Sequence, residues 1–261
     1  MDEPSKTPPA VSTAARGDAV TIEVGPDRRK YLVHKDLLTH HSEYFRRALK
    51  EPWKESDRNG VTVLDDVEPG VFNHFVEWLY LRETEKAFET RGELDEGSST
   101  LRNGRQDYGG LVIKLYIFAD RFGISQLQNF ANNFLAYHLI SDGHPQWYET
   151  ITHAFENIPS TRKLLRILVD VHCACWTDDH DALEDERALR EMLPRDFLLR
   201  ISLRYKEMLD GTASKELDAW AYYEFGSEEE KATWKKYLKT QEEDDEDNNQ
   251  EEGKKISSVK A

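Results

Sequence analysis

The sequence predicts an α+β fold in which a short sheet, capped by helical hairpins, is followed by an α-helical C-terminal extension. Near the start of the 261-residue chain, Val20, Ile22 and Val24 alternate with polar residues, which is typical of a strand with one buried face. From about residue 37 onward, apolar residues recur at intervals of three and four, as in amphipathic helices. Strands followed by a run of helices are typical of the α+β class.

The opening stretch, from Asp18 to Lys50, is predicted to form a β-hairpin followed by a helical hairpin. Gly25-Pro26-Asp27 is a turn sequence between the first strand and a second extended run at residues 31–33. Ser42 is placed to cap the second of two short helices. The apolar residues at helical spacing are Leu37, Leu38, Tyr44, Phe45, Ala48 and Leu49.

The pattern continues with a third strand at residues 61–64 and a helix at residues 69–80 that begins with proline. A second helical hairpin is expected at residues 111–135. Its first helix ends at Gly123 in a left-handed cap, and Ser125 with Gln128 has the pattern of a capping box. Between these parts, residues 82–110 have no sustained apolar period and are expected to form a long loop.

This order of elements resembles the BTB/POZ domain, and in particular its fungal versions. The resemblance extends from Asp18 to about His138. It is carried by Asp18, Val33-His34-Lys35, Leu38, Ser42, Tyr44-Phe45, Ala48-Leu49, Leu115 to Asp120, Phe122-Gly123-Ile124 and Leu127. It implies a short mixed sheet capped by helical hairpins, and a protein–protein interaction module that self-associates and binds partner proteins.

The resemblance also implies that Asp18 and Lys35 contribute to a charged pocket at a dimer groove. The alternative is that Asp18 ends the strand and Lys35 caps a short helix at the surface. Residues 1–17 contain no alternating apolar strand, so a dimer that exchanges an N-terminal strand is not expected. Tyr44 and Phe45 belong to the apolar area beside the hairpin that is expected to contact a partner.

Trp53-Lys54-Glu55 matches the hydrophobic-x-Glu motif of BTB proteins that recruit a cullin ubiquitin-ligase scaffold. In that interpretation Trp53 fills a pocket of the cullin and Glu55 makes a directional contact, so the protein would be a substrate adaptor. The alternative is that Trp53 packs on its own domain, as most tryptophans bury part of their surface.

The chain is predicted to have four parts. Residues 1–17 are rich in Pro, Ser, Thr and Ala and are expected to be a disordered leader. Residues 18–138 form the BTB-like module with the insertion at 82–110. A helical extension at residues 139–238 and an acidic disordered tail at 239–261 complete the chain.

The helical extension is expected to contain helices at residues 147–155, 161–175 and 194–208, with a weaker candidate at 215–238. The predicted buried stripe of the second is Leu164, Leu165, Leu168 and Val171; that of the third is Phe197, Leu198, Ile201 and Tyr205. These stripes are expected to pack on the BTB-like module.

Composition excludes several classes of partner. The formal net charge of −15 argues against direct nucleic-acid binding, which needs clustered Lys and Arg. We expect no membrane span and no cofactor. Cys173 and Cys175 are too close to staple a domain, which fits a reducing compartment, either cytoplasm or nucleus.

Metal binding and catalysis have little support. Cys173 and Cys175, with His172 and His180 nearby, lack zinc-site spacing and are expected to be core thiols. We find none of the nucleotide-binding, nucleophile-elbow or metalloprotease motifs, so we expect no catalytic residues and no enzyme; a small metal-dependent or hydrolytic enzyme is the remote alternative.

Overall fold

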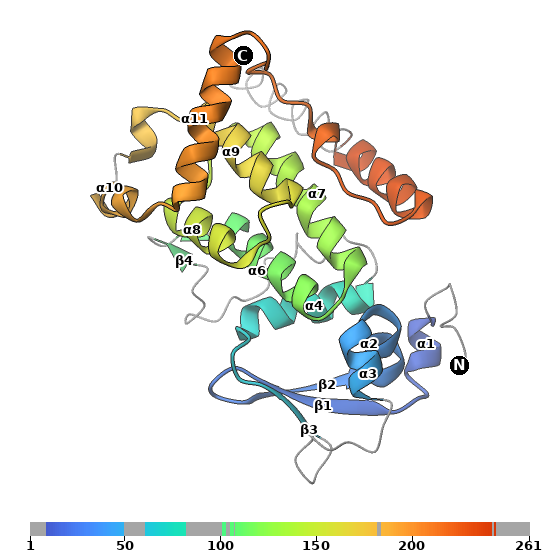
Figure 1. Ribbon diagram of the computed structural model, residues 1–261. Helices are drawn as coiled ribbons and strands as arrows, with labels where there is room; N and C mark the ends of the chain where they lie inside the picture. The colour runs from blue at the N-terminus through green and yellow to red at the C-terminus, as the bar shows by residue number, and fades with distance from the viewer. Residues whose placement is uncertain are drawn as a thin grey trace, which may run out of the picture. The chain divides into compact units, whose positions relative to one another are not determined.

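The computed structural model of the chain describes residues 9–49, 61–81, 101–102, 105–106, 108–181, 184–241 and 243 (Figure 1). The chain divides into two compact units, the first ending at Glu224 and the second beginning at Phe225. The predicted boundary near residue 138 falls inside a continuous helix, α7 (Ser125–Asp142).

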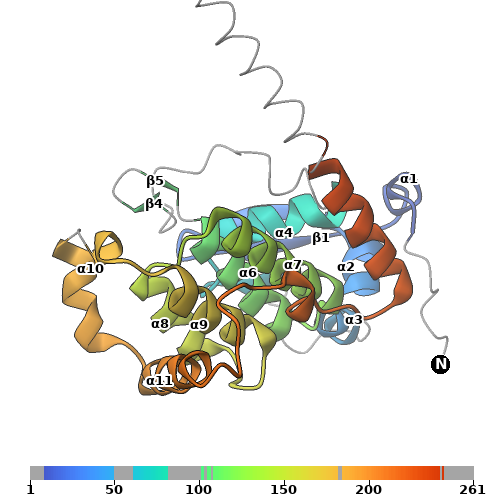
Figure 2. The ribbon, with the colours of Figure 1, turned by 90° about the horizontal axis from the view of Figure 1, so that it is seen from above.

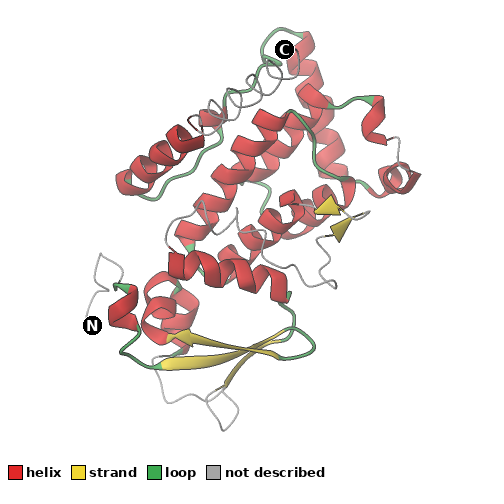
Figure 3. Ribbon diagram, turned by 180° about the vertical axis from the view of Figure 1, so that it is seen from behind, coloured by secondary structure: helices red, strands yellow, loops and turns green. Residues whose placement is uncertain are grey.

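The sheet has three strands, β1 (Ala19–Val24), β2 (Arg29–His34) and β3 (Val61–Leu64), in the order β2-β1-β3. β1 is antiparallel to β2 and parallel to β3, so the sheet is mixed, as predicted. Ile22 and Val24 are buried on the face that α2 (Lys35–His41), α3 (Glu43–Ala48) and α4 (Pro69–Leu81) cover (Figures 1 and 3). Gly25 forms the turn with a positive φ of 75°.

Helices α6 (Tyr108–Arg121) and α7 form the second helical hairpin. Gly123 connects them with a φ of 62°, which confirms the predicted left-handed cap. The predicted capping box is wrong: the N-cap of α7 is Ile124, and Gln128 turns away to donate to Asp120 Oδ1 at 2.7 Å. The Gln128 side chain therefore binds the Asp120 carboxylate on α6 instead of the backbone at the start of α7.

Two further differences concern the leader and the long loop. Residues 11–14, expected to be disordered, form a short helix, α1 (Val11–Ala14), whose Ala14 is buried and which contacts α2. A small hairpin, β4 (Leu101–Arg102) and β5 (Arg105–Gln106), lies within the expected loop. Residues 82–100 of the expected loop fall outside the described residues.

Aromatic rings join the sheet module to the helical hairpin. Phe45 of α3 stacks on Phe122 with ring centroids 5.6 Å apart, and Phe122 lies 4.5 Å from Phe118 of α6. Phe118 in turn lies 5.0 Å from Phe75 of α4. Because each ring comes from a different part of the module, this cluster fixes α3, α4 and α6 together.

The C-terminal part of the first unit is helical, as predicted. Its helices are α8 (Tyr148–Asn157), α9 (Lys163–Cys175), α10 (Glu184–Leu189) and α11 (Arg195–Leu209), with 3-10 turns η1 (Asp178–Asp181), η2 (Arg190–Met192) and η3 (Ala219–Ala221). α9 packs against α7, α8 and α11 (Figures 1 and 2). The candidate helix at 215–238 is displaced, since in the second unit residues 228–241 are helical. None of the described helices is both long and apolar enough to cross a membrane.

Replacing Ser42 by Ala tests the junction between α3 and the helical hairpin. The buried Ser42 hydroxyl donates to the Phe122 carbonyl at 2.6 Å and accepts from the Phe45 N–H at 3.1 Å. We expect Ser42→Ala to lower the free energy of unfolding in urea by about 2 kcal/mol, because two buried backbone groups lose their partner. Ser125→Ala, at an exposed helical serine, is the control and should change it by less than about 0.5 kcal/mol. Equal effects would contradict this.

Stability should fall with acidity because of His172. This histidine is buried on α9, where its Nδ1 has no hydrogen-bond partner among the described residues, and burial lowers its pKa to about 4. The unfolded chain binds this proton near pH 6.5 and the folded chain does not, so stability is present above pH 6.5 and is lost as pH falls toward 4.

We expect this histidine to cost about 2 kcal/mol between about pH 7.5 and about pH 5. Urea unfolding of the native chain and of His172→Phe gives the free energy of unfolding of each at both pH values. The contribution of His172 is the difference between the two proteins in how much this free energy changes with pH. An equal change of this free energy with pH in both proteins would show that His172 is not the cause.

Candidate protein-binding surfaces

Asp18 and Lys35 lie at the same end of the hairpin. The Lys35 backbone N–H donates to the Asp18 carbonyl at 2.9 Å, where the base of the two strands closes. The Asp18 side chain is exposed and that of Lys35 is half-buried. Among the described residues, no ion pair joins the two side chains. Their role in a dimer groove stays a prediction.

Tyr44 and Phe45 are neighbours with opposite environments. Phe45 is 1% exposed and packs in the aromatic cluster, which corrects the expectation that its side chain contacts a partner. Tyr44 is exposed, with its ring edge against Phe122 at 5.0 Å between centroids. Phe45 therefore acts by holding α3 in place, and Tyr44 presents the aromatic surface.

Charged side chains lie on α3 beside Tyr44 in the sequence and at the Phe122 ring that Tyr44 contacts. Glu43 pairs with Arg47 along α3. Arg121, which lies over the Phe122 ring, pairs with Asp66 at 2.6 Å and holds the pKa of the Asp66 carboxyl below its usual range by hydrogen bonding. An exposed aromatic within a charged rim is the usual composition of a protein-binding surface.

The comparison with protein families agrees with this geometry. Residues 18–101 match the family model of the BTB/POZ domain. The opening part of the chain is a BTB/POZ domain. Such domains are protein–protein interaction modules, and here the domain is followed by a mostly helical region. A comparison with curated proteins returned no match.

The BTB/POZ match contains Asp18, Lys35 and Tyr44, and it also contains Trp53 and Glu55. Trp53 and Glu55 lie between residues 50 and 60, outside the described residues. The hydrophobic-x-Glu interpretation therefore stays a prediction.

A second surface, on α11, was missed by the sequence analysis. Phe197, Ile201 and Met208 pack on the core formed with α8 and α9. Leu198 and Tyr205, predicted to be buried with them, are exposed. The exposed leucines form what we call the α11 apolar face: Leu198 (45% exposed), Leu199 (54%), Leu203 (53%) and Leu209 (87%).

The error has a simple physical origin. Helix α11 is apolar on two sides, and helical periodicity gives the spacing of a buried stripe without saying which of two stripes is buried. Leu199 and Leu203, four residues apart and outside the predicted stripe, were the signal that a second apolar face exists.

Cys173 lies in the core, as predicted, whereas Cys175 is only half-buried. Cys173 is buried beside Phe197, and burial raises the pKa of its thiol to about 11, so it stays protonated at neutral pH. Within the described ranges, no group of three or more potential ligands is arranged to hold a metal ion.

Proposed function

We propose that this protein is a non-enzymatic interaction protein that self-associates through its helical region and binds other proteins through its BTB/POZ domain. The observation that carries the proposal is the α11 apolar face. Exposed leucines gathered on one helix are costly in water, and such surface often marks a binding site. The BTB/POZ surface around Tyr44, with Asp18 and Lys35 near the hairpin base, supports the second half of the proposal.

The proposed occupant of the α11 apolar face is the same face of a second copy. The leucines extend over 12 helix positions from Leu198 to Leu209, roughly 16 Å along the axis. Ser202, exposed near the middle, leaves room for two helices to approach closely. Arg195 lies exposed at the start of α11, and Asp210, which pairs with Lys206 of its own helix, lies just after its end.

This distribution of charge favours an antiparallel pair. Two copies related by a twofold axis bring Arg195 of each helix toward Asp210 of the other, so that opposite charges meet at both ends of the apolar contact. A parallel arrangement would place like charges together. The self-complementary face therefore fits a second copy better than an unrelated partner.

The double substitution Leu199→Glu with Leu203→Glu should separate the dimer. Two carboxylates on each helix would be buried against leucines, so we expect at least about a tenfold rise in the dimer dissociation constant. Sedimentation velocity on a concentration series measures it. Leu32→Glu is the control, because Leu32 is 72% exposed on β2 and away from α11.

The BTB/POZ domain offers the competing dimer interface. If Lys35→Glu dissociates the dimer and the α11 double variant does not, self-association goes through the charged pocket that the family resemblance implies. The α11 assignment would then be wrong.

A second candidate function is a substrate adaptor for a cullin-based ubiquitin ligase. It is favoured by Trp53-Lys54-Glu55, which lies inside the BTB/POZ match after α3. The helical region would then select the substrate. The likeness to fungal BTB proteins rests on the insertion after residue 81. The proposed location, in cytoplasm or nucleus, rests on the two free cysteines, which fit a reducing compartment.

Calorimetry with the N-terminal domain of the host's cullin tests the adaptor hypothesis. We expect Trp53→Ala to weaken binding by more than about tenfold, because an aromatic anchor carries much of an interface's energy, and Glu55→Ala to weaken it less. Leu32→Ala, at another exposed apolar residue of the domain, should have no effect. Unchanged affinity in both motif variants, or no binding by the native chain, would exclude this role.

A further inference from the structure

The segment Tyr222–Glu224 is held by side chains of α7 and α9 as a bound peptide would be. The Tyr222 carbonyl accepts from Asn132 Nδ2 at 2.8 Å, and the Tyr223 carbonyl accepts from Lys163 Nζ at 2.8 Å. The Glu224 carbonyl accepts from Asn133 Nδ2 at 2.9 Å, while the Glu224 N–H donates to Asn133 Oδ1 at 2.7 Å. Three consecutive carbonyls are thus bound by side chains.

Asn133 forms hydrogen bonds with the main chain of the segment rather than with a side chain. Both ends of its amide bind one residue, as the backbone of a neighbouring strand would. Asn132 also donates to Asn133 Oδ1 at 3.0 Å, which orients the second amide. Contacts of this type hold an extended peptide with little regard to its sequence.

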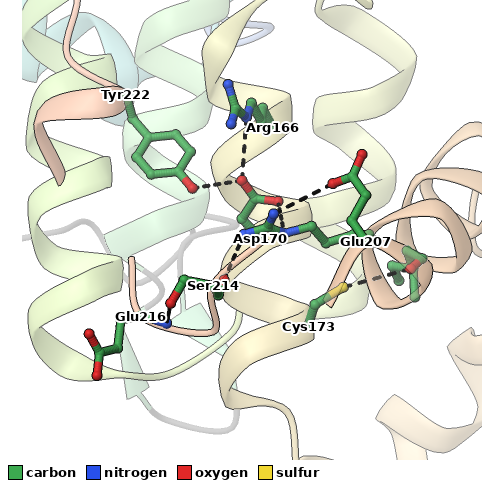
Figure 4. A network of polar contacts seen from close by, with 9 residues as sticks. Arg166, Asp170, Cys173, Glu207, Ser214, Glu216 and Tyr222 are labelled. Carbon is green, nitrogen blue, oxygen red and sulfur yellow. Dashed lines mark hydrogen bonds and ion pairs between the residues drawn. The ribbon is translucent and has the colours of Figure 1, made fainter. Parts of the chain in front are cut away.

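The two tyrosine side chains give the contact its sequence specificity. The Tyr222 hydroxyl donates to Asp170 Oδ2 at 2.6 Å, and Figure 4 shows its ring directed at this carboxylate on α9. Both Tyr222 and Tyr223 are buried. Asp170 is itself fixed by Arg204 of α11 at 2.9 Å and Arg166 at 3.4 Å. A phenol facing a fixed carboxylate is a specific pairing.

The polar side chains that contact the segment are buried beneath it. Asn132, Asn133 and Asp170 are 0 to 4% exposed. Burying amides and carboxylates is unfavourable unless they are hydrogen-bonded, and here the segment supplies partners to all three.

The segment follows a mostly exposed stretch of chain. Between α11 and Tyr222 most side chains are exposed, and Glu224 is the last residue of the first compact unit. The segment is therefore a short anchored stretch between surface residues.

We propose that α7 and α9 form a peptide-docking groove for a tyrosine followed by a second aromatic residue. The chain's own Tyr222–Glu224 segment occupies it in cis, and an external peptide of the same kind binds it in trans when that segment is displaced. Asn132, Asn133 and Lys163 bind the peptide backbone, and Asp170 selects tyrosine over phenylalanine.

The test uses the full-length chain with Tyr222→Ala and Tyr223→Ala, which removes the anchors and leaves the groove intact. The probe is a fluorescent peptide of residues 217–226, followed by anisotropy. We expect saturable binding by this variant and at least about a tenfold weaker signal with the native chain, whose tethered segment competes at an effective concentration on the order of millimolar.

Groove variants in the same background identify the site. Adding Asn133→Ala or Asp170→Asn should weaken peptide binding by about tenfold or more, and a peptide with phenylalanine in place of its first tyrosine should also bind less tightly. Surface substitution Lys215→Ala is the control and should change nothing.

Circular dichroism establishes that the variants are folded. Should the double variant unfold, Tyr222→Phe, which keeps the ring and loses only the hydroxyl contact, replaces it and should bind the peptide better than the native chain does. Absence of saturable binding by a folded anchor variant, or binding indifferent to both groove substitutions, would overturn the proposal.

Discussion

The rest of the fold depends on the docking of α3 onto the turn between α6 and α7. Ser42, Glu43 and Tyr44 at the start of α3 all donate to the carbonyls of Phe122 and Gly123, so the open N–H groups of one helix satisfy the carbonyls that end another. Gly123 is required there because its φ is 62° and an added Cβ would lie 3.1 Å from that of Glu43. Together with the aromatic cluster around Phe122, this contact joins the sheet module to α6 and α7, on which α8 and α9 are then packed.

The helical region is organised differently, around buried polar side chains. Asp170 connects α9, α11 and the segment after η3, through Arg204 and Tyr222. Arg204 also donates to the Ser214 carbonyl at 3.1 Å, which ties down the turn after α11. A buried carboxylate needs such partners, since its desolvation is expensive. Apolar packing brings these helices together, and the polar contacts select which stretch of chain lies between them.

Sequence patterns predicted the sheet, the helices and the left-handed Gly123 because these features follow from local periodicity and backbone geometry. They failed where the outcome depends on distant residues. Gln128 left its capping box for Asp120, and Leu198 and Tyr205 turned outward because the opposite side of α11 fits the α8–α9 core better. Phe45 was taken for a contact residue because apolar character does not distinguish a core ring from a surface ring, whereas its neighbour Tyr44 does lie on the surface. Asn132 and Asn133 gave no signal at all, since their partners lie about 90 residues further on.

The charge balance at Asp170 explains why the Tyr222 segment can be exchangeable and not merely structural. Tyr222 is a neutral partner, and the formal compensation of the carboxylate comes from Arg204 and Arg166, which stay in place when the segment leaves. Departure of the tyrosine therefore removes one hydrogen bond without leaving an unpaired buried charge, and Asn132 and Asn133 become accessible to water. Had the segment carried a lysine or arginine to Asp170, its release would have cost several kcal/mol and the groove would have been a permanent anchor. The use of a phenol at this position is thus what keeps the groove available to another peptide.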